Sequence, residues 1–579
     1  MKEITERWRT RVLSALASMA EQECIDSTKF AALLTPGSPP NSSMGDLAFP
    51  MFPFAGSFKK SPAQIAEQIA EHLGGNAAGI QTAGPYLNVT IDRSAAIAAL
   101  LKNITSAGDN WGSGSELSGK RIMIEFSSPN TNKPLHLGHL RNDILGISCA
   151  RILEARGAQV RKVIIINNRG VHICKSMLAY QKFSSGETPE SLGIKSDRFV
   201  GDCYVRYNQW AAQDSSAEQQ VQSMLLAWEN GDTEIKKLWE LMNKWALDGI
   251  KITYRRTGIS FDHYYFESDT YILGKEQIQK GLEDGVFYRH EDGSVRLDMA
   301  EIGLETKVLL RPNGTSVYIT QDLGTIVSRH EEWPFDQHIY VVGSEQEYHF
   351  IVLFFALRKL GYPWASQLRH LSYGMVNLPE GKMKSREGTV VDADNLIDSL
   401  VEQALNEVKE KGRASDSASP EETAEKIAIA ALHYYLLQVS PKKDMIFNPR
   451  ESLSFTGSTG PYLQYVVARV TGLIAKSGDI DKIPPSPRLL TREDEWQIAR
   501  RIGEFPELVA RAAEKLDPSI LANGLYELAK DFSHYYHEVP IVKTDDRILA
   551  ASRLALAKAV LTTLKNGFLL LNIPYIESM

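Results

Sequence analysis

Two histidines about a quarter of the way along the chain could bind phosphate. His136 and His139 are the first and last residues of the sequence His-Leu-Gly-His. This stretch lies between an apolar strand and a helix. Residues three apart at a helix start share one face, and the unpaired amides of a helix N-terminus bind phosphate. Both imidazoles could therefore donate to phosphate oxygens as negative charge develops, and Gly138 would let a ligand approach the backbone. An isolated motif of this kind is more often a helix cap beside a surface histidine.

A second motif, the glycine-bounded segment Gly381–Gly388, follows about 245 residues later. We call it the cationic loop; its central residues are Lys382, Met383, Lys384, Ser385 and Arg386. Such a loop could fold over a triphosphate and neutralise its leaving group. Alone, it would usually be a solvated charged turn.

The elements around the histidines predict how they are positioned. Arg121–Phe126 is a short apolar strand, residues 136–156 have helical periodicity with Gly157 as the stop, and Val163–Ile166 is a buried strand. Strand, helix and strand in this order form a right-handed parallel crossover. Nucleotides bind beyond the carboxyl ends of such strands, where the histidine pair lies.

The remaining pattern predicts an α/β protein with three domains. Residues 1–115 form a small α+β domain, 116–400 a Rossmann-like parallel-sheet domain, and 401–579 an all-α domain. We expect a helical, polar insertion at about 175–311, which closes with a hairpin at Glu291–Gly293. Other expected elements are helices at 61–70 and 349–360 and strands at 86–91, 316–320 and 339–342.

Composition excludes several classes of protein. The chain has 579 residues, 43% of them hydrophobic, and a formal net charge of -7, which argues against bulk adhesion to a polyanion. We find no signal peptide and no apolar run of about 20 residues, so we expect no membrane span. Four cysteines without Cys-x-x-Cys spacing, and a histidine pair without a nearby third ligand, predict a cytoplasmic protein with reduced thiols and no zinc or other protein-held metal.

Together, the two motifs resemble the paired signatures of class I aminoacyl-tRNA synthetases. The stretches Glu125–Asn130 and Lys133–Asn142 look like the signature block of arginyl-tRNA synthetases. Further stretches resemble other blocks of that family: Gly45–Ala48, Ala83–Asn88, Tyr318–Asp322, Val341–Gln346, Gly460–Tyr465 and Leu525–Lys530. Because these blocks occur in the family's order along nearly the whole chain, chance agreement is implausible.

The resemblance implies a two-step reaction. The carboxylate of L-arginine attacks the α-phosphate of ATP and expels pyrophosphate, and a terminal ribose hydroxyl of tRNA(Arg) then accepts the arginyl group. The implied catalytic residues are His136, His139, Lys133 and Lys382. ATP would contact His136, Gly138, His139, Met375, Val376 and residues 382–386, and the backbone at Gly374–Val376 would meet adenine. Mg²⁺ would arrive with ATP rather than in a protein cage.

The chemistry of a guanidinium group agrees with this substrate. A planar permanent cation needs carboxylates for its donors and an aromatic plane to lie against. Glu125, Asp322 and Tyr318 supply these groups at the family's arginine-binding positions, and Asn130 and Gln346 are implied contacts to the substrate's amino and carboxylate end. Taken individually, Glu125 could be an ordinary strand-end carboxylate, Asp322 a helix cap and Tyr318 a core aromatic residue.

The cationic loop departs from the family pattern at two positions. Lys384 occupies the position of a serine, and Ser385 that of the second lysine. Lys384 could replace that lysine only if the loop backbone shifted by one residue. Arginyl enzymes commonly use a lysine before the histidine turn instead, and we favour Lys133 for this role. The alternative is that Lys133 is a solvated lysine beside a proline.

The helical tail has the aromatic and basic residues that single-stranded RNA requires. We select Tyr462, Tyr465, Lys442 and Lys443 as candidate tRNA contacts, although most helical aromatics are core residues. The resemblance assigns the tail to the anticodon and residues 1–115 to the tRNA elbow. It also implies that arginine activation depends on bound tRNA, and we expect a monomer.

Two rival interpretations remain open from the sequence. An inactive tRNA-binding relative of a synthetase is supported only by Ser385, which stands where the family pattern has its second lysine. A synthetase for another amino acid, or a nucleotidyltransferase without RNA, is disfavoured by Glu125 with Asp322 and by the long helical tail. No editing domain is evident, and a pocket built on buried ionic hydrogen bonds needs none.

Overall fold

A computed structural model describes residues 2–313, 317–379, 391–410 and 419–577. The chain forms two compact units: Met1–Trp111 with Val470–Glu507 and Glu527–Thr563, and Gly112–Arg469 with Leu508–Tyr526 and Leu564–Met579. Within the described ranges, no helix is both long and apolar enough to cross a membrane.

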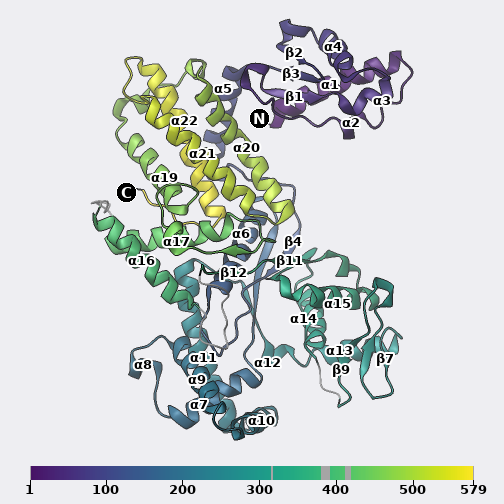
Figure 1. The fold of residues 1–579 in the computed structure, drawn as a ribbon, viewed down its shortest axis with the longest axis vertical. Coiled ribbons are helices and arrows are strands. Elements are labelled where there is room, and N and C mark those ends of the chain that lie inside the picture. The colour runs from purple at the N-terminus through teal and green to yellow at the C-terminus, as the bar shows by residue number, and fades with distance from the viewer. Residues whose placement is uncertain (1, 314–316, 380–390, 411–418, 578–579) are drawn as a thin grey trace. The chain divides into compact units, whose positions relative to one another are not determined.

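The first unit begins with a small α+β layer. Its antiparallel sheet has the order β1 (Leu47–Pro50), β3 (Tyr86–Val89), β2 (Ile80–Ala83), next to helices α1 (Lys2–Gln22) and α4 (Pro62–His72) (Figure 1). Ser61 caps α4, because its hydroxyl accepts from the Gln64 N–H and the Gln64 side chain accepts from the Ser61 N–H. The expected helix and strand of this region are confirmed.

The second unit is built on a five-stranded parallel sheet. Its order is β11 (Leu368–Tyr373), β10 (Gln337–Gly343), β4 (Arg121–Glu125), β5 (Gln159–Ile166), β6 (His263–Phe266). Helix α6 (Leu137–Ala155) connects β4 to β5, and Gly157 follows it with φ +94°, as the sequence predicted. Because β4 and β10 are parallel neighbours, their carboxyl ends meet at the edge of the sheet where α6 begins.

The segment expected as a helical insertion also contributes to this sheet. Its helices are α7 (Val171–Phe183), α8 (Pro189–Leu192), α9 (Ser196–Ala211), α10 (Ser216–Glu229) and α11 (Thr233–Thr257). Their core includes Tyr180, Phe199 and Trp245, whose rings lie 5.4 to 6.0 Å apart. The following residues form β6, which sequence reasoning missed because this edge strand is only half-buried and lacks an apolar run.

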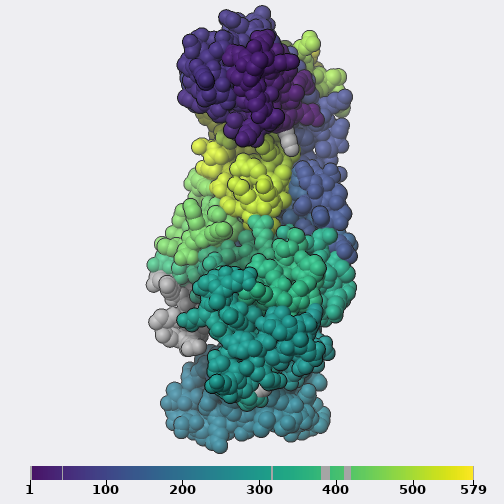
Figure 2. Space-filling view, turned by 90° about the vertical axis from the view of Figure 1, so that its right-hand side faces the viewer, coloured from purple at the N-terminus to yellow at the C-terminus, as the bar shows by residue number. Residues whose placement is uncertain are grey.

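A second lobe follows β6. Helices α12 (Glu267–Thr270) and α13 (Gly274–Glu283) lead into the antiparallel strands β7 (Tyr288–Arg289), β8 (Val295–Leu297) and β9 (Lys307–Leu310), with the expected hairpin between β7 and β8. In the space-filling view, the teal residues of this lobe adjoin the blue residues of the helical lobe (Figure 2).

The strand expected at 316–320 is wrong. Residues 314–316 lie outside the described ranges, and Tyr318 is the first residue of helix α14 (Tyr318–Glu332). Ile319, Leu323 and Ile326 recur at helical spacing and are buried in the core that α14 shares with α15 (Glu347–Lys359). The helical spacing of these apolar residues extends over the whole helix, and it outweighs the short β-branched run at 316–320 that suggested a strand.

The tail is largely helical, as expected, with one short exception. Its main helices are α16 (Ala393–Glu410), α17 (Pro420–Leu437), α19 (Gly460–Ala475), α20 (Glu493–Lys515), α21 (Ser519–Glu538) and α22 (Arg547–Leu570). The exception is β13 (Met445–Ile446), which pairs in parallel with β12 (Val376–Asn377). This pairing joins the residues after α17 to the segment that precedes the cationic loop.

Arg141 on α6 holds this junction together. Its fully buried guanidinium donates from Nη1 to the carbonyl oxygens of Gly374 (2.5 Å) and Met375 (3.0 Å). From Nη2 it donates to those of Pro441 (3.2 Å) and Lys443 (2.7 Å). One side chain therefore fixes the helix start against the residues that directly precede β12 and β13.

Replacing Arg141 tests this role. Loss of a hydrogen bond that leaves a buried polar group unsatisfied costs about 1 to 3 kcal/mol. With four carbonyl groups affected, we expect Arg141→Met to lower the free energy of unfolding of the second unit by at least about 3 kcal/mol. Urea unfolding followed by circular dichroism measures this change. The control, Arg151→Met on the same helix, removes one bond to the Leu569 carbonyl (2.8 Å) and should cost less; equal effects would contradict the assignment.

Candidate active site

The histidine turn, His136–His139, caps α6 with its own side chains. Nδ1 of His136 accepts from the Gly138 N–H (3.1 Å), and Nδ1 of His139 accepts from the His136 N–H (3.1 Å). The ring centroids are 3.9 Å apart. A neutral imidazole that accepts at Nδ1 carries its proton on Nε2, so each ring retains one donor for a ligand.

Burial keeps both rings neutral. It lowers the pKa of His136 to about 4 and the pKa of His139 well below its ordinary value, and the nearby Lys133 ammonium acts in the same direction. At neutral pH the turn therefore offers N–H donors without a fixed positive charge on the imidazoles.

Gly138 is required by the neighbouring ring. A Cβ atom at this position would lie 2.9 Å from Cε1 and 3.0 Å from Nδ1 of His136. A side chain here would displace the imidazole that caps the helix. The glycine thus serves the geometry of His136, in addition to the close ligand approach expected from the sequence.

Both described flanks of the cationic loop meet this turn. Val376, before the loop, lines a cavity together with His136. After the loop, Asp392 pairs with His136 as an isolated antiparallel bridge, and the Leu137 N–H donates to the Val391 carbonyl (3.3 Å). Lys382, Met383, Lys384, Ser385 and Arg386 themselves lie outside the described residues.

A cavity of about 690 Å³ opens on one side of the turn. We call it the signature cleft; it is lined by Ser127, Ser128, Asn130, His136, Gly138, His139, Asn142, Val341, Val342, Gly343, Glu345, Gln346, Tyr373, Met375, Val376 and Asn377. Candidate ATP contacts and two candidate arginine contacts, Asn130 and Gln346, thus share one cavity. Residues from β10, β11 and the start of α6 form its walls, as expected for the carboxyl edge of a parallel sheet.

Two serines in the wall of the cleft have unusual backbone angles. Ser127 has φ +77° and Ser128 φ +48°, a region that non-glycine residues rarely adopt. The Ser127 N–H donates to Oδ1 of Asn142 (2.6 Å), and its hydroxyl lies 2.5 Å from that of Tyr254. The Asn167 side chain donates to the Ser128 carbonyl (3.0 Å). These contacts hold a strained backbone in place.

The adenine side of the cleft differs from expectation in its backbone groups. The Gly374 N–H donates to the Pro441 carbonyl (2.9 Å), and the Met375 N–H donates to Asp444 Oδ1 (2.7 Å). Their carbonyl groups accept from Arg141. These groups are therefore engaged within the protein, while the Met375 residue is 41% exposed in the cleft.

Three candidate arginine residues, Glu125, Asp322 and Tyr318, are not among the residues that line the signature cleft. Glu125, at the end of β4, is buried and ion-paired with Arg329 of α14, which is also buried. Burial raises the pKa of Glu125; the Arg329 guanidinium opposes this effect, and the Asp322 carboxylate adds to it. The Arg329 guanidinium also lies over the Tyr265 ring, 4.4 Å from its centroid.

Asp322 and Tyr318 lie one turn apart on α14. Nε2 of His349 donates to Oδ2 of Asp322 (2.6 Å), and the Asp322 side chain is 38% exposed. Tyr318 is 76% exposed. Sequence reasoning missed Arg329 and His349; their only signal was a charged or polar residue on the inward face of an amphipathic helix.

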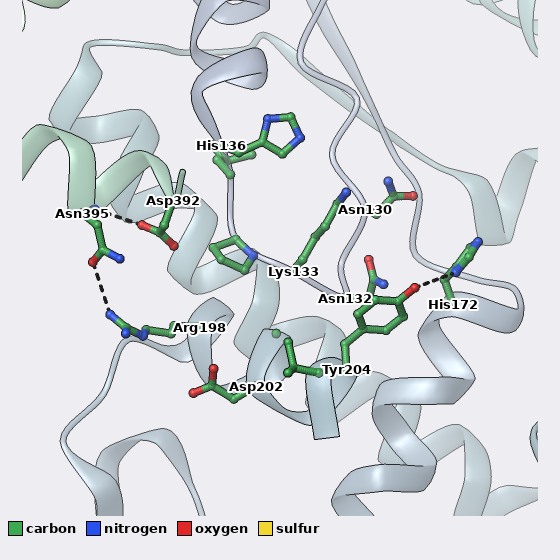
Figure 3. A pocket seen from close by; sticks show the side chains of 14 residues that line it. Asn130, Asn132, Lys133, His136, His172, Arg198, Asp202, Tyr204, Asp392 and Asn395 are labelled. Carbon is green, nitrogen blue, oxygen red and sulfur yellow. Dashed lines mark hydrogen bonds between the residues drawn. The ribbon is translucent and has the colours of Figure 1, made fainter. Parts of the chain in front are cut away.

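Lys133 faces a second cavity on the other side of the histidine turn. This cavity of about 480 Å³, which we call the lysine cavity, is lined by Asn130, Asn132, Lys133, Pro134, Leu135, His136, His172, Arg198, Gly201, Asp202, Tyr204, Val205, Asp392 and Asn395 (Figure 3). Burial lowers the pKa of Lys133. Among the described residues, its ammonium has no hydrogen-bond or ion-pair partner.

The candidate RNA contacts are separate from one another. Tyr465 is half-buried under the Arg469 guanidinium, 4.4 Å from its ring centroid, and the Tyr462 ring lies 5.9 Å from that of Tyr526. Lys442 and Lys443 are exposed just before β13. Both tyrosines are half-buried with ring contacts inside the protein, whereas both lysines are exposed.

Comparisons with known proteins identify the family. Residues 102–449 match the model of the class I tRNA synthetase catalytic domain of the arginine type, 463–579 the DALR anticodon binding domain, and 6–91 the arginyl tRNA synthetase N terminal domain. The arginine--tRNA ligases of Treponema denticola and Treponema pallidum are 54% and 51% identical, over 100% of both chains in each case.

A solved structure agrees with these relatives. The arginyl-tRNA synthetase of Thermus thermophilus superimposes with a TM-score of 0.82 at 25% identity, covering 99% of this chain and 100% of that one. The predicted fold class is thereby confirmed: a parallel-sheet catalytic domain with a small N-terminal domain and a helical C-terminal domain. The chain belongs to the arginyl-tRNA synthetases and is an aminoacyl-tRNA ligase that joins arginine to tRNA.

Proposed function

We propose that the signature cleft holds ATP with its phosphates at the N-terminus of α6, where His136 and His139 donate from Nε2 to the α-phosphate region. The observation that carries this proposal is the pair of internal bonds at Nδ1, which leaves both Nε2–H groups for a ligand. The arginine carboxylate attacks the α-phosphate, pyrophosphate departs, and the terminal ribose hydroxyl of tRNA(Arg) accepts the arginyl group. Positioning and fixed donors supply the catalysis, and no covalent enzyme intermediate is needed.

The same proposal assigns the adenine and phosphate contacts. The backbone groups of Gly374 and Met375 are already bonded, so the backbone of Val376 meets adenine and the exposed Met375 side chain packs against the base. Lys382 and the other residues of the cationic loop act on the phosphates, and Lys133 supplies the cation that the altered loop lacks. The meeting of both loop flanks at His136 supports this assignment.

For the amino acid, we propose that Asp322 binds the guanidinium group directly. Glu125 and Arg329 neutralise each other, whereas the carboxylate of Asp322 is partly exposed and, besides its bond from His349, can accept from a substrate cation. The exposed ring of Tyr318 lies one helical turn away and offers a plane for the guanidinium. Asn130 and Gln346, in the cleft wall, meet the amino and carboxylate end.

Metal ions and partners complete the proposal. Mg²⁺ enters with ATP, held mainly by phosphate oxygens. Among the described residues, no group of three or more His, Cys, Asp or Glu side chains could hold a metal ion. The protein acts as a cytoplasmic monomer with no zinc and no membrane attachment.

The domains have separate tasks in this proposal. Residues 1–115 bind the tRNA elbow, 116–400 catalyse the reaction with an insertion at about 175–311, and 401–579 bind the anticodon. The matched N-terminal and DALR anticodon binding models support this division. Lys442 and Lys443 contact RNA phosphate, and Tyr462 and Tyr465 support the tRNA surface.

Removing either histidine tests the phosphate assignment. A lost donor to developing charge typically lowers the rate by about 10² to 10³. We expect that loss for His136→Ala and for His139→Ala in arginine-dependent ATP/pyrophosphate exchange with tRNA present. His290→Ala, in the exposed hairpin, is the control with unchanged rate. Rates of the first two variants within twofold of the parent would refute the assignment.

A neutral substitution at Asp322 tests the arginine contact. Loss of one partner from a charged hydrogen bond costs about 2 kcal/mol or more, so Asp322→Asn should raise KM for arginine at least about 30-fold. KM for ATP should stay the same. Glu331→Gln removes an exposed carboxylate from the same helix and should change neither constant. An unchanged KM for arginine in Asp322→Asn would exclude direct contact.

Charge reversal tests the RNA surface before β13. We expect Lys442→Glu with Lys443→Glu to weaken tRNA binding and to reduce the slope of log affinity against log salt by about 2, because each lysine neutralises one phosphate. Filter binding across a salt series measures both effects. Lys426→Glu, at a lysine already paired with Glu422 (2.9 Å), is the control. Unchanged affinity and slope would remove these lysines from the surface.

A further inference from the structure

One carboxyl group beneath the signature cleft is fully buried and has no partner among the described residues. Asp143, on α6, is 0% exposed, and neither of its oxygens is hydrogen-bonded within the described ranges. Withdrawing a carboxylate from water without a counter-ion is unfavourable. Burial accordingly raises the pKa of Asp143 to about 7, and the Ser127 hydroxyl opposes this effect. Asp143 lines neither the signature cleft nor the lysine cavity, so the proposed reaction does not use it directly.

Within the described ranges, the titratable groups that interact with Asp143 are two tyrosine hydroxyls. Burial raises the pKa of Tyr254, on α11, well above its ordinary value and that of Tyr373, on β11, to about 12, and the Asp143 carboxylate adds to both effects. Both hydroxyls are therefore uncharged at neutral pH. No charged side chain of the described residues acts on the pKa of Asp143. Arg141, two residues earlier on α6, is already shared among four backbone carbonyl groups.

Ser127 connects this buried acid to the wall of the signature cleft. Its hydroxyl lies 2.5 Å from the Tyr254 hydroxyl, and it is also the polar group that lowers the pKa of Asp143. Its backbone N–H donates to Oδ1 of Asn142 (2.6 Å), the residue directly before Asp143. Ser127 lines the cleft with φ +77°, and a residue in this region persists only while its surroundings hold it.

The two protonation states of Asp143 favour different partners for the Ser127 hydroxyl. A carboxylate can only accept hydrogen bonds, and a buried one attracts a nearby O–H donor. The described arrangement, in which the Ser127 hydroxyl bonds to Tyr254 and not to Asp143, is the one expected for the neutral acid. Loss of the proton draws the Ser127 O–H toward Asp143 and leaves Tyr254 as the donor to Ser127.

We infer that Asp143 is a positioning residue of the cleft wall: without its proton it takes the Ser127 hydroxyl from Tyr254, and the wall that leads to Asn130 then binds arginine less tightly. This inference rests on the proposed function, which assigns Asn130 to the amino and carboxylate end of arginine. Asp143 acts through Ser127, without touching a substrate. The neutral acid is the competent form, since it leaves the described wall undisturbed.

The dependence of KM for arginine on pH tests this role in ATP/pyrophosphate exchange by the full chain with tRNA present. From pH 6 to pH 8.5, across the pKa of about 7, KM for arginine should rise in the parent at least about fivefold, the equivalent of one lost hydrogen bond. Asp143→Asn is neutral and of the same size, and it should keep the low KM at both pH values. Asp143→Ala should also lack the step.

Ser148→Ala is the matched control for these variants. Ser148 lies on the same helix, is 0% exposed, and its hydroxyl likewise has no hydrogen-bond partner within the described ranges. It lines neither cavity. Because the substitution leaves Asp143 in place, the control should show the same rise of KM for arginine with pH as the parent.

Thermal unfolding gives a second measurement that needs no turnover. The pKa of Asp143 is raised from 3.8 in the folded state, so its contribution to stability is present below that value and is lost as the pH rises to about 7. Asp143→Asn removes this loss. The melting temperature of Asp143→Asn should therefore exceed that of the parent by more at pH 8 than at pH 5.

Three outcomes would overturn the inference. An equal rise of KM for arginine in the parent and in Asp143→Asn would assign the titration to another group. A difference in melting temperature that is the same at pH 5 and pH 8 would show that Asp143 does not titrate in the folded protein. If the parent shows no arginine-dependent exchange, the proposed function fails and the role in arginine binding fails with it; a melting difference that still grows with pH would place that failure in the function and not in the buried acid.

Discussion

A single buried arginine determines how the two halves of the nucleotide site face each other. Arg141 has no carboxylate partner; its guanidinium is shared among four backbone carbonyl groups from two distant stretches of chain. Burial lowers its pKa to about 10, so it still carries its charge at neutral pH. The carbonyl dipoles stabilise that charge together with the nearby Asp444 carboxylate and the Tyr373 ring. These contacts tie the adenine-side segment and residues 441–443 to the first turns of α6.

The electrostatics of the site follow from what burial does to each group. The histidines remain neutral because charging them away from water is unfavourable, and the Glu125–Arg329 pair cancels itself. Other charged groups stay within reach of a ligand: Glu345 lines the signature cleft, and Lys133 lines the lysine cavity together with Asp202 and Asp392. The carboxylate of Asp322 is partly exposed on α14.

Local sequence pattern predicted the elements whose signals lie within a few residues. β4, α6 and β5 followed from apolar runs and helical spacing, and the histidine turn from its place at the strand-to-helix junction. The pattern could not predict β6, whose partner strand lies about a hundred residues earlier. Nor could it predict that Arg329 would neutralise Glu125, because an ion pair across 204 positions exists only after the sheet has formed.

The resemblance to a family allowed predictions that local sequence pattern could not make. Only the structure shows how those residues are placed. The resemblance brought Glu125, Tyr318 and Asp322 together as an arginine pocket, and the structure distinguishes them by exposure: one carboxylate is internal, the other open. It also placed Lys442 and Lys443 in a tail assigned to the anticodon, whereas the structure has them beside the strand that pairs with β12. Such differences arise because the fold brings together segments that are far apart in the sequence, and a linear motif does not contain that information.

The paired serines with positive φ bear on how the cleft wall could evolve. Glycine at Ser127 or Ser128 would relieve local strain of about 1 to 3 kcal/mol, but it would also enlarge the conformational freedom of the denatured chain. At Ser127 it would further abolish the hydroxyl contact with Tyr254. Serine at these sites thus accepts local strain but limits the freedom of the denatured chain, and it makes the shape of the wall depend on Tyr254 of α11.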